Sequence, residues 1–149
     1  MGTDKNSNSF RFLYEKPKLG ERVFIDAMAH VSGDVTLGDD VSIWPLVAIR
    51  GDVNRIAIGA GSNIQDGSVL HVTHESAWQP EGKALLVGEH VTVGHAAVLH
   101  ACTIGDRCLV GMGAIVMDGA VLEPDSMVAG GAVVPPGKTI ASGTLWRGN

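Results

Sequence analysis

Aliphatic residues recur at every sixth position along most of this chain. The longest unbroken series has seven members: Ile104, Val110, Val116, Leu122, Val128, Val134 and Ile140. Three shorter series precede it: Val31, Leu37, Ile43 and Ile49; then Ile58, Ile64 and Leu70; then Val87, Val93 and Leu99. A fixed internal period indicates a solenoid, and a period of six predicts a parallel β-helix. Because helix-period stripes are lacking, we expect little helix.

The pattern also predicts how the chain is divided. Residues 1–9 are polar and without period, which indicates a disordered or expression-derived start. Residues 10–149 are expected to form a single β-helix domain. Within it, residues 10–30 are expected to be irregular, with four candidates to cover the open first coil: Phe10, Phe12, Phe24 and Ile25.

Two interruptions lengthen the six-residue spacing and one shortens it. Ile49 and Ile58 are nine residues apart, and Leu70 and Val87 are seventeen apart. We interpret the extra residues as loops that leave the corners of the solenoid, the second being a loop excursion at about 73–86. The shortening lies between Leu99 and Ile104, where the spacing is five.

Counting hexads predicts which residues stack. With three hexads to a triangular coil, as in known hexapeptide-repeat proteins, one column contains three aliphatic residues: Ile49, Leu70 and Leu99. The residues that follow them, Arg50, His71 and His100, then stack about 4.8 Å apart. Because side chains alternate along a strand, these residues point outward. Two outward imidazoles on adjacent coils can bind one metal ion, so His71 and His100 are candidate ligands.

His95 is the third candidate ligand. It lies five residues before His100, a contour of up to about 16 Å, and is expected on another face of the prism, stacked on Asp66. His95 of the same chain is therefore a poor partner for His71 and His100. A copy from an adjacent subunit could complete the site, which predicts a metal at a subunit interface, most simply in a cyclic trimer.

Composition and charge exclude some classes of binding partner. The net charge is −5 and no Lys/Arg cluster stands out, so we expect neither nucleic acid nor a membrane as a partner. The two cysteines, Cys102 and Cys108, are too few for a disulfide framework, and no charged-then-apolar leader opens the chain. The expected compartment is the cytoplasm.

Five short motifs add a family resemblance. They are Ile49-Arg50-Gly51-Asp52, Asn63-Ile64-Gln65-Asp66-Gly67, His71-Val72-Thr73-His74, Val93-Gly94-His95 and Leu99-His100. With these motifs the sequence resembles the gamma-class carbonic anhydrases, which are hexapeptide-repeat proteins. The resemblance covers about residues 20–149 and implies an all-β, left-handed parallel β-helix that forms a homotrimer with a metal site at each subunit interface.

The resemblance also implies a reaction. His71 and His100 of one subunit and His95 of the next would bind Zn²⁺ or Fe²⁺ and leave an open position for water. The metal would lower the pKa of that water from 15.7 towards about 7 and so supply hydroxide that attacks CO2. The implied enzyme is a lyase that hydrates CO2 to bicarbonate. Gln65 would orient the hydroxide, and Asn63 would help to place the substrate.

Three charged residues receive supporting roles from the resemblance. Arg50 and Asp66 would form an ion pair across the interface, and Asp52 would hold Arg50.

The sequence departs from the family prototype at two positions where the prototype has glutamate; these positions are His74 and Val53 here. The resemblance also implies a C-terminal helix after Trp146-Arg147-Gly148-Asn149, which either lies beyond Asn149 or is absent.

Two other functions remain open on the same scaffold. One is an acyl-CoA-dependent transferase or thioesterase, although such enzymes typically use one catalytic histidine and need no set of three. The other is a non-catalytic metal-binding trimer, in which the metal serves assembly.

Overall fold

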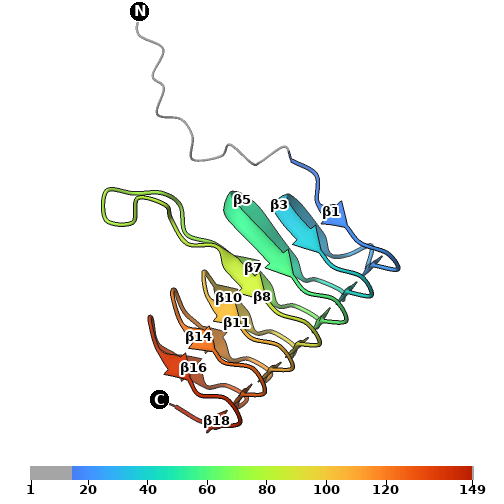
Figure 1. Cartoon of the computed structure of the whole chain (residues 1–149). Helices are drawn as coiled ribbons and strands as arrows, with labels where there is room; N and C mark the ends of the chain where they lie inside the picture. The colour runs from blue at the N-terminus through green and yellow to red at the C-terminus, as the bar shows by residue number, and fades with distance from the viewer. Residues whose placement is uncertain (1–14, 149) are drawn as a thin grey trace, which may run out of the picture.

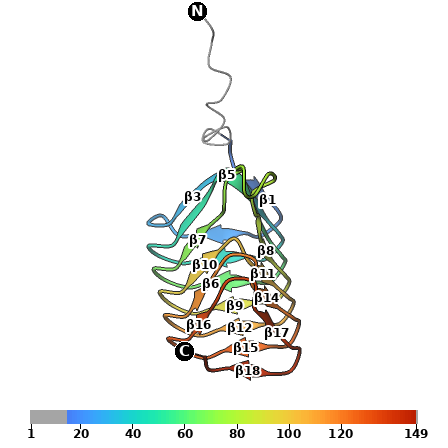
Figure 2. The ribbon, with the colours of Figure 1, turned by 90° about the vertical axis from the view of Figure 1, so that its left-hand side faces the viewer.

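The chain forms a stack of short strands that wind around one apolar interior (Figures 1 and 2). The structure, a computed structural model, describes residues 15–148, and that part contains only strands, turns and bends. The predicted start at residues 1–9 and the capping candidates Phe10 and Phe12 lie outside the described residues. No helix in the described part is long and apolar enough to cross a membrane.

The strands lie on three faces. The first face contains β3 (His30–Leu37), β5 (Ala48–Ile58), β7 (Val69–His71), β10 (Val98–His100), β13 (Ile115–Val116) and β16 (Val133–Val134). The second face contains β1 (Lys18–Leu19), β8 (Leu85–Val87), β11 (Thr103–Ile104), β14 (Val121–Leu122) and β17 (Thr139–Ile140), together with the second halves of β3 and β5. The third face contains β2 (Phe24–Ile25), β4 (Ser42–Ile43), β6 (Asn63–Ile64), β9 (Thr92–Val93), β12 (Leu109–Val110), β15 (Met127–Val128) and β18 (Leu145–Trp146).

All pairings between these strands are parallel, and neighbours in space belong to successive coils. Ile49 pairs with Leu70 and Leu70 with Leu99, as the column count predicts. All three side chains are fully buried. Burial of an aliphatic side chain contributes about 1.5–3 kcal/mol, so such columns stabilise the stack along its whole length. The predicted all-β, left-handed parallel β-helix of hexapeptide repeats is confirmed, while the trimer stays a prediction.

The first coil begins earlier than expected. Residues 10–30 were expected to be irregular, but β1 pairs with β3 and β2 pairs with β4. Leu19 and Ile25 therefore extend the six-residue series backwards from Val31. Within the described residues the end coil has a neighbour on one side only, and Leu19 is 53% exposed, which obscures the inward-outward pattern there.

The first interruption is not a loop, contrary to the prediction. β5 runs unbroken from Ala48 to Ile58, and the extra residues form a bulge in it. Its partner β3 advances two residues, from Gly33 to Val35, while β5 advances five, from Gly51 to Ile56. A bulge bends a strand and redirects side chains. Asp52 lies in this bulge and is only 4% exposed.

The second interruption leaves the stack as a projecting loop (Figure 1). Between β7 and β8 its base is held by an antiparallel bridge between Thr73 and Lys83. Asn54, from the β5 bulge, donates through Nδ2 to the backbone oxygens of Thr73, at 3.2 Å, and Glu81, at 3.1 Å. The bulge and the projecting loop are thus fastened to each other.

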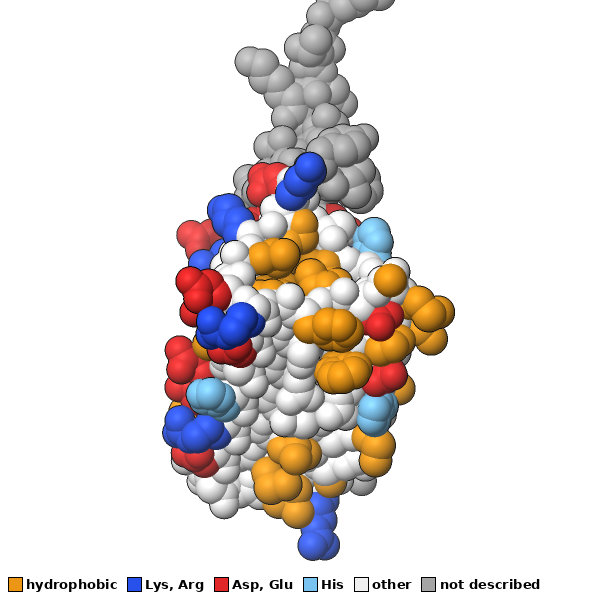
Figure 3. All heavy atoms as spheres, turned by 90° about the vertical axis from the view of Figure 1, so that its right-hand side faces the viewer, with side chains coloured by type: hydrophobic (Ala, Val, Ile, Leu, Met, Phe, Trp, Pro, Cys, Tyr) orange, Lys and Arg blue, Asp and Glu red, His pale blue; other side chains and the backbone are white. Residues whose placement is uncertain are grey.

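The outer surface carries both charged and hydrophobic side chains. Figure 3 shows one side of the molecule, where Lys, Arg, Asp and Glu side chains are most frequent along the left edge and hydrophobic side chains form separate groups at the centre and the right, with acidic and His side chains beside the right-hand group. At the turns, Arg22 pairs with Asp40 and Arg107 with Asp125 between adjacent coils. Exposed pairs of this kind contribute little to stability, so the buried columns carry the fold.

Candidate metal centre

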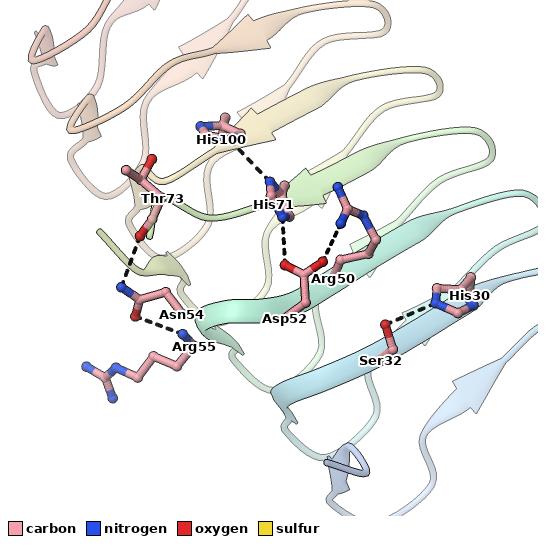
Figure 4. Close-up of polar contacts among 9 residues, drawn as sticks. All are labelled: His30, Ser32, Arg50, Asp52, Asn54, Arg55, His71, Thr73 and His100. Carbon is pink, nitrogen blue, oxygen red and sulfur yellow. Dashed lines mark hydrogen bonds and ion pairs between the residues drawn. The ribbon is translucent and has the colours of Figure 1, made fainter. Parts of the chain in front are cut away.

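His71 and His100 lie side by side on the outer surface of the first face. β7 and β10 pair with His71 opposite His100. The Nδ1 atom of His71 is 3.3 Å from the Nε2 atom of His100, and the ring planes are tilted by 52°. Figure 4 shows both rings above the parallel strands, with Asp52 and Arg50 on the next strand. We call His71 Nδ1 and His100 Nε2 the facing nitrogens.

The other nitrogen of each ring contacts a carboxylate. His71 Nε2 lies 2.8 Å from Asp52 Oδ1, and His100 Nδ1 lies 2.6 Å from Asp118 Oδ1. A carboxylate only accepts hydrogen bonds, so each of these ring nitrogens carries the proton. In neutral imidazoles the facing nitrogens are then both unprotonated, and their lone pairs point at a shared space.

This arrangement fits a divalent metal. Two nitrogen ligands of a tetrahedral zinc ion, each bonded at about 2.0–2.1 Å, lie about 3.3–3.4 Å apart. The observed separation of the facing nitrogens is 3.3 Å. Histidine ligands of metals also typically donate their second nitrogen to a carboxylate, as both rings do here. His71 and His100 would hold the ion through the facing nitrogens.

Each carboxylate has a second partner that fixes it in turn. Asp52 Oδ2 accepts from Arg50 Nη1, and Asp118 Oδ2 accepts from the Thr73 hydroxyl. Burial acts to raise the pKa of Asp118, but the hydrogen bonds from Thr73 and His100 outweigh it and hold that pKa below its usual range. Asp118 is therefore ionised at neutral pH.

Asp118 was not among the residues that the sequence analysis selected. It follows β13, the strand beside β10, eighteen residues after His100. Leu99 pairs with Val116 and Thr103 with Val121, so the four steps from Leu99 to Thr103 oppose five steps on the next coil. The five-residue spacing from Leu99 to Ile104 thus brings His100 opposite Asp118. Counting one coil onward from His100, with the short spacing from Leu99 to Ile104 taken into account, would have found Asp118.

The remaining predicted site residues lie on the third face and at its corner. His95 Nδ1 is 3.1 Å from Asp66 Oδ2. Gln65 Nε2 donates to Asn63 Oδ1 at 3.1 Å, and Asn63 Nδ2 donates to Thr92 Oγ1 at 3.2 Å. We call Asn63, Gln65, Asp66 and His95 the third-face cluster. They line a surface hollow of about 540 Å³ together with Ser42 and Trp44.

The structure therefore divides the predicted site into two parts. Arg50, Asp52, His71 and His100 gather on the first face, and the third-face cluster gathers elsewhere. Within residues 15–148 of a single chain, no three potential ligand side chains converge on one point.

Two positions that depart from the prototype are also resolved. His74 lies in the projecting loop and is exposed. Val53, in the β5 bulge, packs against the hydrophobic core.

Comparison with known proteins supports the fold and the resemblance. The family model described as Bacterial transferase hexapeptide (six repeats) matches residues 16–51 and 101–136. The protein YrdA of Escherichia coli is 57% identical over 133 residues, which cover 89% of this chain and 72% of YrdA. The chain belongs to the hexapeptide-repeat family.

Two further relatives add to this comparison. The mitochondrial gamma carbonic anhydrase 2 of Arabidopsis thaliana is 45% identical over 137 residues, which cover 91% of this chain. The match spans about half of that relative, 48% of its length. The crystal structure of a hexapeptide transferase family protein from Anaplasma phagocytophilum is similar with a TM-score of 0.79 at 43% identity, over 87% of this chain and 72% of that one. The resemblance to gamma carbonic anhydrases is thus confirmed as a relationship in sequence.

Proposed function

We propose that this protein is a metal-dependent, carbonic anhydrase-like enzyme that hydrates CO2 to bicarbonate at an interface between subunits. The observation that carries the proposal is the pair of facing nitrogens, 3.3 Å apart, with each ring oriented by its own carboxylate. The 45% identity to a gamma carbonic anhydrase supports the same reaction.

A second copy of the chain would supply the third ligand. His95 is exposed at a corner where backbone hydrogen bonds join successive turns, from Pro45 through Asp66 and His95 to Met112. The same corner exposes apolar side chains, with Leu46 at 62% and Met112 at 64%. Seating this corner against the His71–His100 pair of a neighbour would bury that apolar area and bring His95 to the facing nitrogens. Repetition of one such heterologous contact closes a ring, most simply a trimer.

The chain's own residues would then orient the reactants. A bound Zn²⁺ or Fe²⁺ would supply acidity, since such a metal lowers the pKa of a water ligand from 15.7 to about 7. Asp52 and Asp118 keep both rings aimed at one point. Because the Gln65 amide nitrogen is directed to Asn63, its oxygen remains to accept a hydrogen bond from water. Arg50 would pair with Asp66 of the neighbour while Asp52 holds it.

Metal content and CO2 hydration, measured together on protein purified without oxygen, test the proposal. We expect about one metal per subunit and catalysed hydration in the wild type, and loss of both in His100→Ala. His90→Ala is the matched control, because His90 is an exposed histidine at a distant turn. A wild type that takes up no Zn²⁺ or Fe²⁺ would disprove the proposal.

An acyl-CoA-dependent transferase or thioesterase is the second candidate, because both the family model and the Anaplasma relative carry the name transferase. Calorimetric titration with coenzyme A and acetyl-CoA distinguishes the two. Saturable binding that persists in His100→Ala would favour the transferase. Stoichiometric metal without hydration, with dissociation of the oligomer by a chelator, would instead favour a metal that serves assembly.

A further inference from the structure

The contacts of Asp118 single it out on the first face. Its Oδ1 accepts from His100 Nδ1 at 2.6 Å, and its Oδ2 accepts from the hydroxyl of Thr73. We infer that Asp118, held by Thr73, is a positioning residue that keeps the proton of His100 on Nδ1 and leaves Nε2 free as a metal ligand. This inference rests on the proposed metal centre.

The geometry leaves the Asp118 carboxylate little freedom. Its two oxygens are engaged from different coils, by His100 at the end of β10 and by Thr73 at the base of the projecting loop. The carboxylate therefore cannot rotate without breaking one of the two bonds. Because it accepts from both partners, it dictates which nitrogen of His100 carries hydrogen.

The equivalent arrangement around His71 differs in charge. Asp52 is paired with the cationic Arg50, whereas Asp118 is paired with the neutral hydroxyl of Thr73. The negative charge of Asp118 is thus not balanced by either of its hydrogen-bond partners. An anionic acceptor on the far nitrogen raises the basicity of a histidine ligand, so His100 is expected to be the stronger donor of the two.

A purely structural role for Asp118 makes a different prediction. If the residue only tied the loop base to the stack, an asparagine of the same shape would serve, because its Oδ1 still accepts from Thr73. Its Nδ2 would, however, donate to His100 Nδ1 and move the ring proton to Nε2. Asp118→Asn therefore preserves shape while reversing the direction of one hydrogen bond.

The experiment compares wild type, Asp118→Asn and Asp125→Asn as full-length chains. Asp125 is a matched carboxylate that also bridges two coils, through Arg107, but lies exposed at a corner. Two-bond ¹H–¹⁵N correlation spectra of metal-free protein report the tautomer of His100, and chelator competition reports Zn²⁺ affinity. We expect the Nδ1–H form in wild type and Asp125→Asn, and the Nε2–H form with about 10–100-fold weaker Zn²⁺ binding in Asp118→Asn.

Unchanged affinity and an unchanged tautomer in Asp118→Asn would overturn the inference. Thr73→Ser and Thr73→Val provide a second test if Asp118→Asn fails to fold: the serine variant should bind Zn²⁺ as the wild type does, and the valine variant more weakly. Equal affinity in the two would also count against the inference. If the wild type binds no metal, the proposed function fails, and the tautomer of His100 alone decides the role of Asp118.

Discussion

At the scale of single residues, Cys102 shows how the surroundings of the candidate metal centre set the reactivity of a side chain. Its side chain is buried one coil before Ala120, close to Asp118. Burial, and then the negative charge of Asp118, raise the pKa of the Cys102 thiol to about 12. Because the thiolate is the reactive form, Cys102 is expected to resist alkylation at pH 8 in the folded protein.

Mass spectrometry after iodoacetamide treatment checks this expectation. Cys102 should remain unmodified in native buffer and become fully modified in denaturant. Modification in native buffer at the rate of a free thiol would mean that the core around β10 and β11 opens readily.

The same scale shows what sequence could and could not predict of the site. His71 and His100 were found because they occupy a fixed place in a strict period, and a period converts sequence distance into spatial distance. Asp118 occupies a turn of the next coil, opposite the stretch from Leu99 to Ile104 in which the spacing is one residue short. Its contact with His100 depends on that local shortening of the period. A regular column count ignores the shortening and therefore does not predict the contact.

At the scale of elements, β3 and β5 approach closely at the bulge. Gly33 has φ of +85°, and a Cβ there would lie 2.3 Å from the backbone oxygen of Gly51. Gly131 has φ of +69°, but a Cβ there meets nothing within 4 Å. Both substitutions to alanine impose a left-handed backbone on a residue with a side chain, and only Gly33→Ala adds a backbone clash.

We therefore expect Gly131→Ala to lower the free energy of unfolding by about 1 kcal/mol and Gly33→Ala by more than about 2 kcal/mol. Urea denaturation followed by circular dichroism measures both. Equal losses in the two variants would show that β3 and β5 can separate at the bulge without cost.

The bulge also explains why this element was predicted wrongly. Extra residues in a six-residue period indicate a departure from the regular coil, but the period alone does not say whether the chain loops out or stays in the sheet. Here the Asp52 side chain bonds to His71 and Arg50, and the Asn54 side chain bonds to the projecting loop. These side-chain bonds hold the additional residues against the stack.

At the scale of the whole molecule, the first face and the third-face cluster carry different parts of one proposed site. This division can be tested by mixing subunits. His95→Ala lacks the third ligand, and His100→Ala lacks one facing nitrogen, so neither forms a complete site alone. When equal amounts co-assemble at random, about a quarter of the interfaces combine an intact His71–His100 pair with an intact His95.

Metal content and hydration of the co-refolded mixture measure this complementation. We expect about a quarter of the wild-type values from the mixture and background values from each variant by itself. Background values from a mixture that demonstrably exchanges subunits would rule out a site shared between copies in this way.

The polar contacts of the first face run along the axis of the stack, through Asp52, His71 and His100 on the neighbouring strands β5, β7 and β10 to Asp118 in the turn after β13. In a solenoid each coil touches only its neighbours, so unwinding begins at an end and proceeds coil by coil. Fraying that starts at β17 and β18 reaches Asp118 before it reaches His100 or His71. The outermost support of the candidate ligands is thus the first to be lost, and the affinity for metal would decline before the rest of the stack unwinds.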